Sequence, residues 1–112
     1  MGNNHAALDA VFHALADPTR RAVIQRLGQG SATVTELAEP FDMALPSFVK
    51  HIAVLEASGL IGSKKIGRVR TCTLKPKKLA AAERWFGEQR ELWESRYNNL
   101  DNLLSRMGGE EK

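Results

Sequence analysis

The chain has 112 residues, which suits one domain with a modest hydrophobic core. Its single cysteine excludes an internal disulfide, and no apolar run approaches the roughly 18 residues that a membrane helix needs. The first residues also lack the basic and then apolar segments of a secretory signal. These features predict a cytoplasmic protein with no membrane partner.

The formal net charge of +3 is unevenly distributed. Residues 45–78 contain eight basic residues and one acidic residue, Glu56, so this stretch carries +7 and the remaining chain −4. A basic segment in an otherwise nearly balanced chain is typical of a surface that contacts a polyanion such as DNA. Chance clustering on a solvated surface is the alternative interpretation at this point.

Two helices are predicted before residue 30. The apolar face of the first, within residues 5–15, consists of Leu8, Val11, Phe12 and Leu15. Asp17 and Pro18 mark the start of the second, because an aspartate can cap the helix and a proline fits its first turn. This second helix runs to Gly28, and its apolar face consists of Val23, Ile24 and Leu27.

Residues 33–60 are predicted to form two short helices joined by a tight turn, a helix-turn-helix. Thr33 and Glu36 have the spacing of a capping box, which begins the first helix. Pro40 has no amide hydrogen, so that helix should end close to it. Pro46 fits the first turn of the next helix.

The second helix of this pair has two distinct faces. Phe48, Ile52 and Leu55 recur at helical spacing and should point into the core. The outward positions are predicted to be Ser47, Lys50, His51 and Val54. Hydroxyl, ammonium and imidazole groups on one strip suit the base edges and phosphates of a major groove. Many amphipathic helices have a polar outer face, so this feature alone leaves DNA binding undecided.

The next segment is predicted to be a β-hairpin, with strands at about 60–66 and 69–74 around a turn at Gly67 and Arg68. Its basic residues are Lys64, Lys65, Arg68 and Arg70. A basic hairpin directly after a helix pair indicates a winged helix-turn-helix, in which the wing lies along the sugar-phosphate backbone. Charged residues also protect edge strands from aggregation, which is the alternative reason for them.

The last predicted helix spans residues 76–105, and residues 108–112 are expected to fray as a tail. Apolar and aromatic residues recur along it at steps of three and four, beyond what so small a domain could cover. We therefore expect a homodimer formed through the terminal helices, although packing on the chain's own first helix remains an alternative. The expected dimer interface consists of Leu8, Phe12, Phe86, Trp93, Leu100 and Leu103. The prediction is a mainly α, single-domain winged helix-turn-helix over residues 1–107.

Several motifs resemble the ArsR family of bacterial transcriptional repressors. They are Leu15–Arg21 (LADPTRR), Glu36–Ala38 (ELA), Lys50–Ile61 (KHIAVLEASGLI) and Gly67–Arg68. The resemblance implies a homodimeric repressor that binds a pseudo-palindromic operator in or near its own promoter and is released by an inducer. Matching positions in the family's recognition helix place Ser47, Lys50 and His51 at the DNA. Leu45 and Pro46 would lie near the point where this helix enters the groove.

The chain departs from the family pattern at the cap of that helix. Many members have a serine where this chain has Ala44, so a side-chain cap worth roughly 1 kcal/mol is expected to be missing.

Metal-sensing relatives carry cysteines in the first helix of the helix-turn-helix, or Asp, His and Glu sets on the last helix. Residues 33–43 contain neither Cys nor His, and the last helix contains no His. A zinc or arsenic site needs three or four converging ligands. We therefore expect no metal and no cofactor, and His5 and His13 are interpreted as surface or core residues. The Trp85–Phe86 and Leu92–Arg96 segments resemble a metal-free branch of the family, whose effector would be non-metal and is unidentified.

Three other functions are weighed. Cys72 is predicted to be half-buried in the second strand of the hairpin, without the exposed thiolate or second cysteine that redox sensing uses. A winged-helix module that binds an acidic protein, and a metal- or redox-responsive repressor with an unrecognised site, remain alternatives. An enzyme is not expected, because no phosphate loop, nucleophile elbow or paired catalytic carboxylates are present, so no catalytic residue is assigned.

Overall fold

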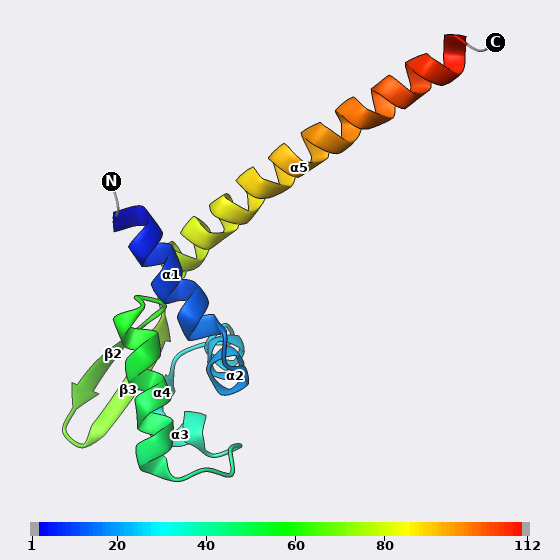
Figure 1. Cartoon of the computed structure of the whole chain (residues 1–112). Coiled ribbons are helices and arrows are strands. Elements are labelled where there is room, and N and C mark those ends of the chain that lie inside the picture. Colours follow the sequence, from blue (N-terminus) through cyan, green and yellow to red (C-terminus); the bar gives the residue numbers. More distant parts are fainter. Residues whose placement is uncertain (1–2, 111–112) are drawn as a thin grey trace. The chain divides into compact units, whose positions relative to one another are not determined.

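The computed structural model describes the backbone of residues 3–110 and the side chains of residues 6–107. The elements in chain order are α1 (Asn3–Leu15), α2 (Pro18–Leu27), β1 (Ala32–Thr33), α3 (Val34–Ala38), α4 (Leu45–Ala57), β2 (Ile61–Ile66), β3 (Val69–Leu74) and α5 (Pro76–Glu110) (Figure 1). The chain divides into two compact units, one ending at Ala81 and one beginning at Ala82. The first unit holds α1 to β3 and the start of α5.

The helix starts follow the predicted local signals. Asp17 caps α2, where its carboxylate accepts a 3.0 Å hydrogen bond from the Arg20 amide. Thr33 and Glu36 form the predicted capping box at α3, with reciprocal bonds of 3.1 and 3.0 Å. Ala44 occupies the N-cap position of α4 and provides no side-chain hydrogen bond, as expected. The predicted missing cap is therefore confirmed.

The core of the first unit includes part of each predicted apolar face, but four residues of those faces are only half-buried: Leu8, Phe12, Leu15 and Ile24. Its buried hydrophobic residues include Val11, Ala14, Val23, Leu27, Leu37, Phe48, Ile52, Leu55, Leu60, Ile61 and Cys72. The rings of Phe41 and Phe48 lie 5.5 Å apart, which packs the turn before α4 against this core. Ala14 is fully buried although it was not among the predicted core residues.

The sheet has three antiparallel strands in the order β1-β3-β2. The predicted hairpin pairs Ile61 with Leu74 and Ile66 with Val69. Its turn contains Gly67 at φ +63°, in the left-handed region that favours glycine. The additional strand β1 pairs Ala32 with Cys72 and was not predicted, because two residues are too few to show a periodic pattern.

The terminal helix is longer than expected. It continues to Glu110, whereas its end was predicted at Ser105 and fraying from residue 108. Gly108 and Gly109 near its end each lower helix stability by about 1 kcal/mol relative to alanine. A glycine keeps its backbone N–H and C=O groups, so the helix can continue through both residues. Residues 111 and 112 of the expected tail lie outside the described residues. Among the helices that the structure describes, none has the length and apolar composition needed to cross a membrane.

Candidate nucleic-acid interface

The helix-turn-helix consists of α3 and α4, and α4 occupies the position of the recognition helix. Phe48, Ile52 and Leu55 are buried, as predicted, which fixes the rotation of α4 about its axis. Ser47 and Lys50 are exposed, in agreement with the predicted outward strip, whereas Val54, predicted on the same strip, is only partly exposed. Leu45 and Pro46, at the start of the helix, are also exposed.

His51 is not on the exposed strip, contrary to the sequence-based expectation. Its side chain is 22% exposed, and its Nδ1 atom lies 3.0 Å from Arg20 Nη1 and 3.8 Å from the Asp17 carboxylate. Successive residues of a helix are 100° apart, so the direction opposite the core lies closer to Lys50 than to His51. Lys50 itself points most directly away from the core, and Val49 and Ala53, which are both exposed, lie on the flank of α4 that faces the wing.

The contact with Arg20 holds one edge of the imidazole ring. A guanidinium group has only donors, so His51 Nδ1 is the acceptor in this hydrogen bond. Nδ1 is therefore occupied within the protein, and Nε2 is the ring nitrogen left for another partner. Arg20 also donates from Nε to the Ala14 carbonyl and from Nη2 to the His13 carbonyl. This side chain therefore connects the end of α1 with the recognition helix.

Residues 61–74, here called the wing, carry the predicted basic side chains. Lys64, Lys65 and Arg68 are exposed, and the left-handed Gly67 allows the tight turn beside them. The wing lies beside α4 in the first unit (Figure 1). Exposed cations beside a recognition helix are the arrangement with which winged helices contact phosphates.

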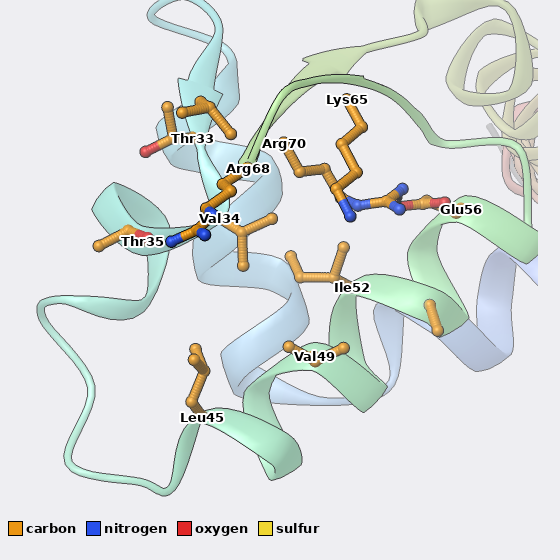
Figure 2. Close-up of a pocket in the computed structure, with 12 residues that line it drawn as sticks. Thr33, Val34, Thr35, Leu45, Val49, Ile52, Glu56, Lys65, Arg68 and Arg70 are labelled. Carbon is orange, nitrogen blue, oxygen red and sulfur yellow. Dashed lines mark ion pairs between the residues drawn. The ribbon is translucent and has the colours of Figure 1, made fainter.

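Arg70 differs from the other wing cations because acidic and polar groups hold it. Its Nη1 atom donates to Ser63 Oγ at 2.8 Å. The same atom lies 3.9 Å from Glu56 Oε1, and Figure 2 shows Arg70 beside Glu56. Ser63 Oγ in turn donates to Glu56 Oε1 at 2.9 Å. This relay ties the wing to the end of α4 and neutralises the only acidic side chain within residues 45–78. The relay was not predicted, because Ser63 and Glu56 are on different elements.

A groove of about 690 Å³ lies between α4 and the wing. On the α4 side its lining is apolar and includes Leu45, Val49, Ile52 and Ala53. On the wing side it includes Lys65, Arg68 and Arg70, and Figure 2 shows Arg68 extending from the wing toward α3. We call this feature the wing groove. Its α4 wall is mainly apolar but also includes Glu56, and its wing wall is mainly cationic but also includes Val69.

Cys72 is fully buried, whereas the sequence predicted half-burial. It lies on the central strand β3, between β1 and β2, and burial raises the pKa of its thiol. A buried thiol with a raised pKa has little thiolate, the form that reacts with oxidants. Nor do His, Cys, Asp and Glu side chains within residues 6–107 form any group of three or more that could hold a metal ion. His13 is exposed, and the His5 side chain lies outside the described residues.

The second unit consists of α5 from Ala82 onward and exposes many large apolar side chains. Those more than half exposed include Phe86, Leu92, Trp93, Tyr97, Leu100, Leu104 and Met107, with Leu103 at 50%. Trp93 stacks on Tyr97 with ring centroids 5.8 Å apart. A shallow hollow of about 480 Å³ lies between Phe86, Trp93 and Arg96. Leu8 and Phe12, the other expected interface residues, are half-buried on α1.

The fold, together with the exposed side chains of α4 and the wing, defines the class of this protein. It is a winged helix-turn-helix DNA-binding protein. A helix-turn-helix domain family matches residues 15–62. The chain is 38% identical over 73 residues to the HTH-type transcriptional regulator Rv2034 of Mycobacterium tuberculosis, covering 65% of this chain and 68% of that protein. It is 33% identical over 61 residues to the transcriptional repressor SdpR of Bacillus subtilis, covering 54% and 68% of the two chains.

Solved structures give the same result. The crystal structure of the ArsR family transcriptional regulator RHA00566 is 61% identical, with a TM-score of 0.78 over 80% of this chain and 93% of that chain. A more distant structure from Mycobacterium bovis, 20% identical with a TM-score of 0.60 over 78% and 82% of the chains, is described as a homodimeric winged helix-turn-helix DNA-binding domain. This chain belongs to the ArsR family. It is a DNA-binding transcriptional regulator, and its family is not one of enzymes.

Proposed function

We propose that this protein is a homodimeric repressor that binds a pseudo-palindromic operator in or near its own promoter, in the cytoplasm. The main observation behind this proposal is that two neighbouring elements expose polar and basic side chains. These are Ser47 and Lys50 on α4, and Lys64, Lys65 and Arg68 on the adjacent wing. Side chains that can read base edges and side chains that can hold phosphates lie in one compact unit. A winged helix-turn-helix uses both to bind duplex DNA.

The DNA-contacting set that we propose consists of Leu45, Pro46, Ser47, Lys50, His51, Lys64, Lys65, Arg68 and Arg70. Within it, His51 and Arg70 act differently from the rest. His51 offers only Nε2 because Arg20 occupies Nδ1, and Arg70 is paired with Glu56. Both are therefore supporting contacts beside the freely exposed cations.

The dimer is proposed to form through α5, with contributions from Leu8 and Phe12 on α1. An exposed series of Phe86, Trp93, Leu100 and Leu103 on one helix leaves apolar area that a second copy would remove from water. A two-fold dimer presents two recognition helices to two half-sites, which accounts for operator symmetry. The release signal is proposed to be a non-metal effector.

The testing experiment is DNase footprinting of the purified protein on the DNA upstream of its own gene, at several salt concentrations. The proposal predicts a protected inverted repeat and an affinity that falls steeply with salt. Absence of any protected site at physiological salt would instead favour a winged-helix module that binds protein. Monomeric protein in solution and on the operator would contradict the dimer.

A further inference from the structure

The flank of α4 that faces the wing groove carries an apolar side chain that is not part of the core. Val49 is 46% exposed, and Ala53 is exposed one turn later on the same face. A β-branched residue lowers helix propensity, and its exposed methyl groups gain nothing from water. The core contacts of α4 are made by other residues, so Val49 is available for a partner.

The wing groove indicates the chemistry of that partner. Val49 and Ala53 line its apolar wall, and Arg68 lines its cationic wall. An occupant must therefore present apolar groups to α4 and anionic groups to the wing. Duplex DNA has both, since the C5-methyl group of thymine lies in the major groove and phosphates flank it.

We propose that Val49, with Ala53 beside it, reads the C5-methyl group of a thymine in the operator. Residues four apart lie above one another on a helix, about 6 Å apart, which is comparable to one or two base-pair steps of about 3.4 Å. The apolar pair thus reads methyl groups while Lys50, next to Val49, reads acceptor atoms of a neighbouring base. This inference rests on the proposed function, since it specifies how the same face selects its sequence.

The test compares thymine with deoxyuridine, which lacks only the methyl group. The duplexes contain the operator identified by footprinting. In each duplex, one thymine is replaced by deoxyuridine at the same position of both half-sites. A series of such duplexes covers every thymine of the half-site. For the contacted position, the wild-type protein should lose about fourfold in affinity per half-site, or about 15-fold in total. The Val49→Ala protein should lose most of this discrimination and keep only the part that Ala53 contributes.

Two variants serve as matched controls. Lys50→Ala should weaken binding to both duplexes while preserving their ratio of affinities, because the lysine does not contact the methyl group. Val49→Thr keeps a β-branched side chain with one methyl group, so it should retain part of the discrimination. Circular dichroism verifies folding, which should be unaffected because Val49 lies outside the core.

Equal wild-type affinity for all replaced duplexes would overturn the inference, as would an unchanged ratio in Val49→Ala. A footprinted half-site without any thymine would also overturn it. These outcomes all require a specific footprint, so they are distinguishable from failure of the proposed function, in which no footprint is obtained.

Discussion

Arg20 Nη1 lies 3.0 Å from His51 Nδ1, which joins the first turn of α2 to the recognition helix. The same guanidinium group binds the Ala14 and His13 carbonyls at the end of α1. One side chain therefore links three helices. It helps to hold α4 against α1 and α2, and it occupies Nδ1 of the histidine on α4.

Arg20→Ala should lower the free energy of unfolding by about 2 kcal/mol, because charge-assisted hydrogen bonds contribute roughly 1.5–3 kcal/mol. His51→Ala should cost less, about 1 kcal/mol, because the carbonyl bonds of Arg20 remain. Urea unfolding measures both. The double variant tests the coupling, since a sum of the two single effects would show that the Arg20–His51 contact contributes nothing.

Asp17 should make the free energy of unfolding decrease at acid pH. Its carboxylate accepts the Arg20 amide hydrogen bond, which lowers the pKa of Asp17 below its ordinary value. A lowered pKa in the folded state stabilises the fold above the ordinary value, and this contribution is lost as the pH falls through the lowered pKa. Asp17→Ala should therefore cost about 1 kcal/mol at pH 7, and the difference from wild type should shrink below about pH 4.

Asp17→Asn is the matched control for this prediction. Asparagine still accepts the cap hydrogen bond but does not titrate, so most of the stability at pH 7 should remain. A wild-type minus Asp17→Asn difference that stays constant from pH 7 to about pH 2.5 would contradict the assigned role of the carboxylate.

Ala44→Ser should stabilise the protein. Ala44 has the extended backbone of an N-cap, at φ −62° and ψ 141°, but no side-chain oxygen. Serine at this position can accept a free amide hydrogen of the first turn of α4, which is worth about 1 kcal/mol. The gain should appear in thermal and urea unfolding. Ala44→Val, which adds volume without an acceptor, should give no gain.

The sequence predicted those parts of the fold that depend on local signals. The Thr33–Glu36 capping box and the Gly67 turn each involve residues at most four apart, so their chemistry is visible in the sequence. The burial of Phe48 followed from helical spacing. Because these signals are local, they were sufficient to predict the winged helix-turn-helix.

The candidate site was less predictable because it depends on contacts between distant residues. The Arg20–His51 contact spans 31 positions and turns His51 away from the exposed strip. The pairing of β1 with β3 depends on residues 38 and 40 positions apart. The exposure of Val49 was not predicted, because only the packed structure shows which apolar positions remain outside the core.

The wing cations should differ in their contribution to DNA binding. Arg68→Ala should reduce the slope of log affinity against log salt by about 1 for each phosphate that the protein no longer neutralises, or by about 2 in a dimer. Arg70→Ala should change the slope less, because Arg70 is held by Ser63 and Glu56. Filter binding or fluorescence anisotropy across salt concentrations measures both slopes. A larger effect from Arg70 would contradict the role assigned to the relay.

Leu100→Glu should convert the dimer to a monomer. Leu100 is 54% exposed on the apolar series of α5, and a buried carboxylate at a dimer interface has no partner there. Asn98→Glu is the matched control, because residue 98 lies on the opposite face of the same helix, and it should remain dimeric. Sedimentation equilibrium measures the mass of each variant. A monomer cannot hold both half-sites at once, so Leu100→Glu should weaken operator binding by about 10²-fold or more, whereas Asn98→Glu should not. If both variants had the same mass and the same operator affinity, the dimer interface would lie elsewhere.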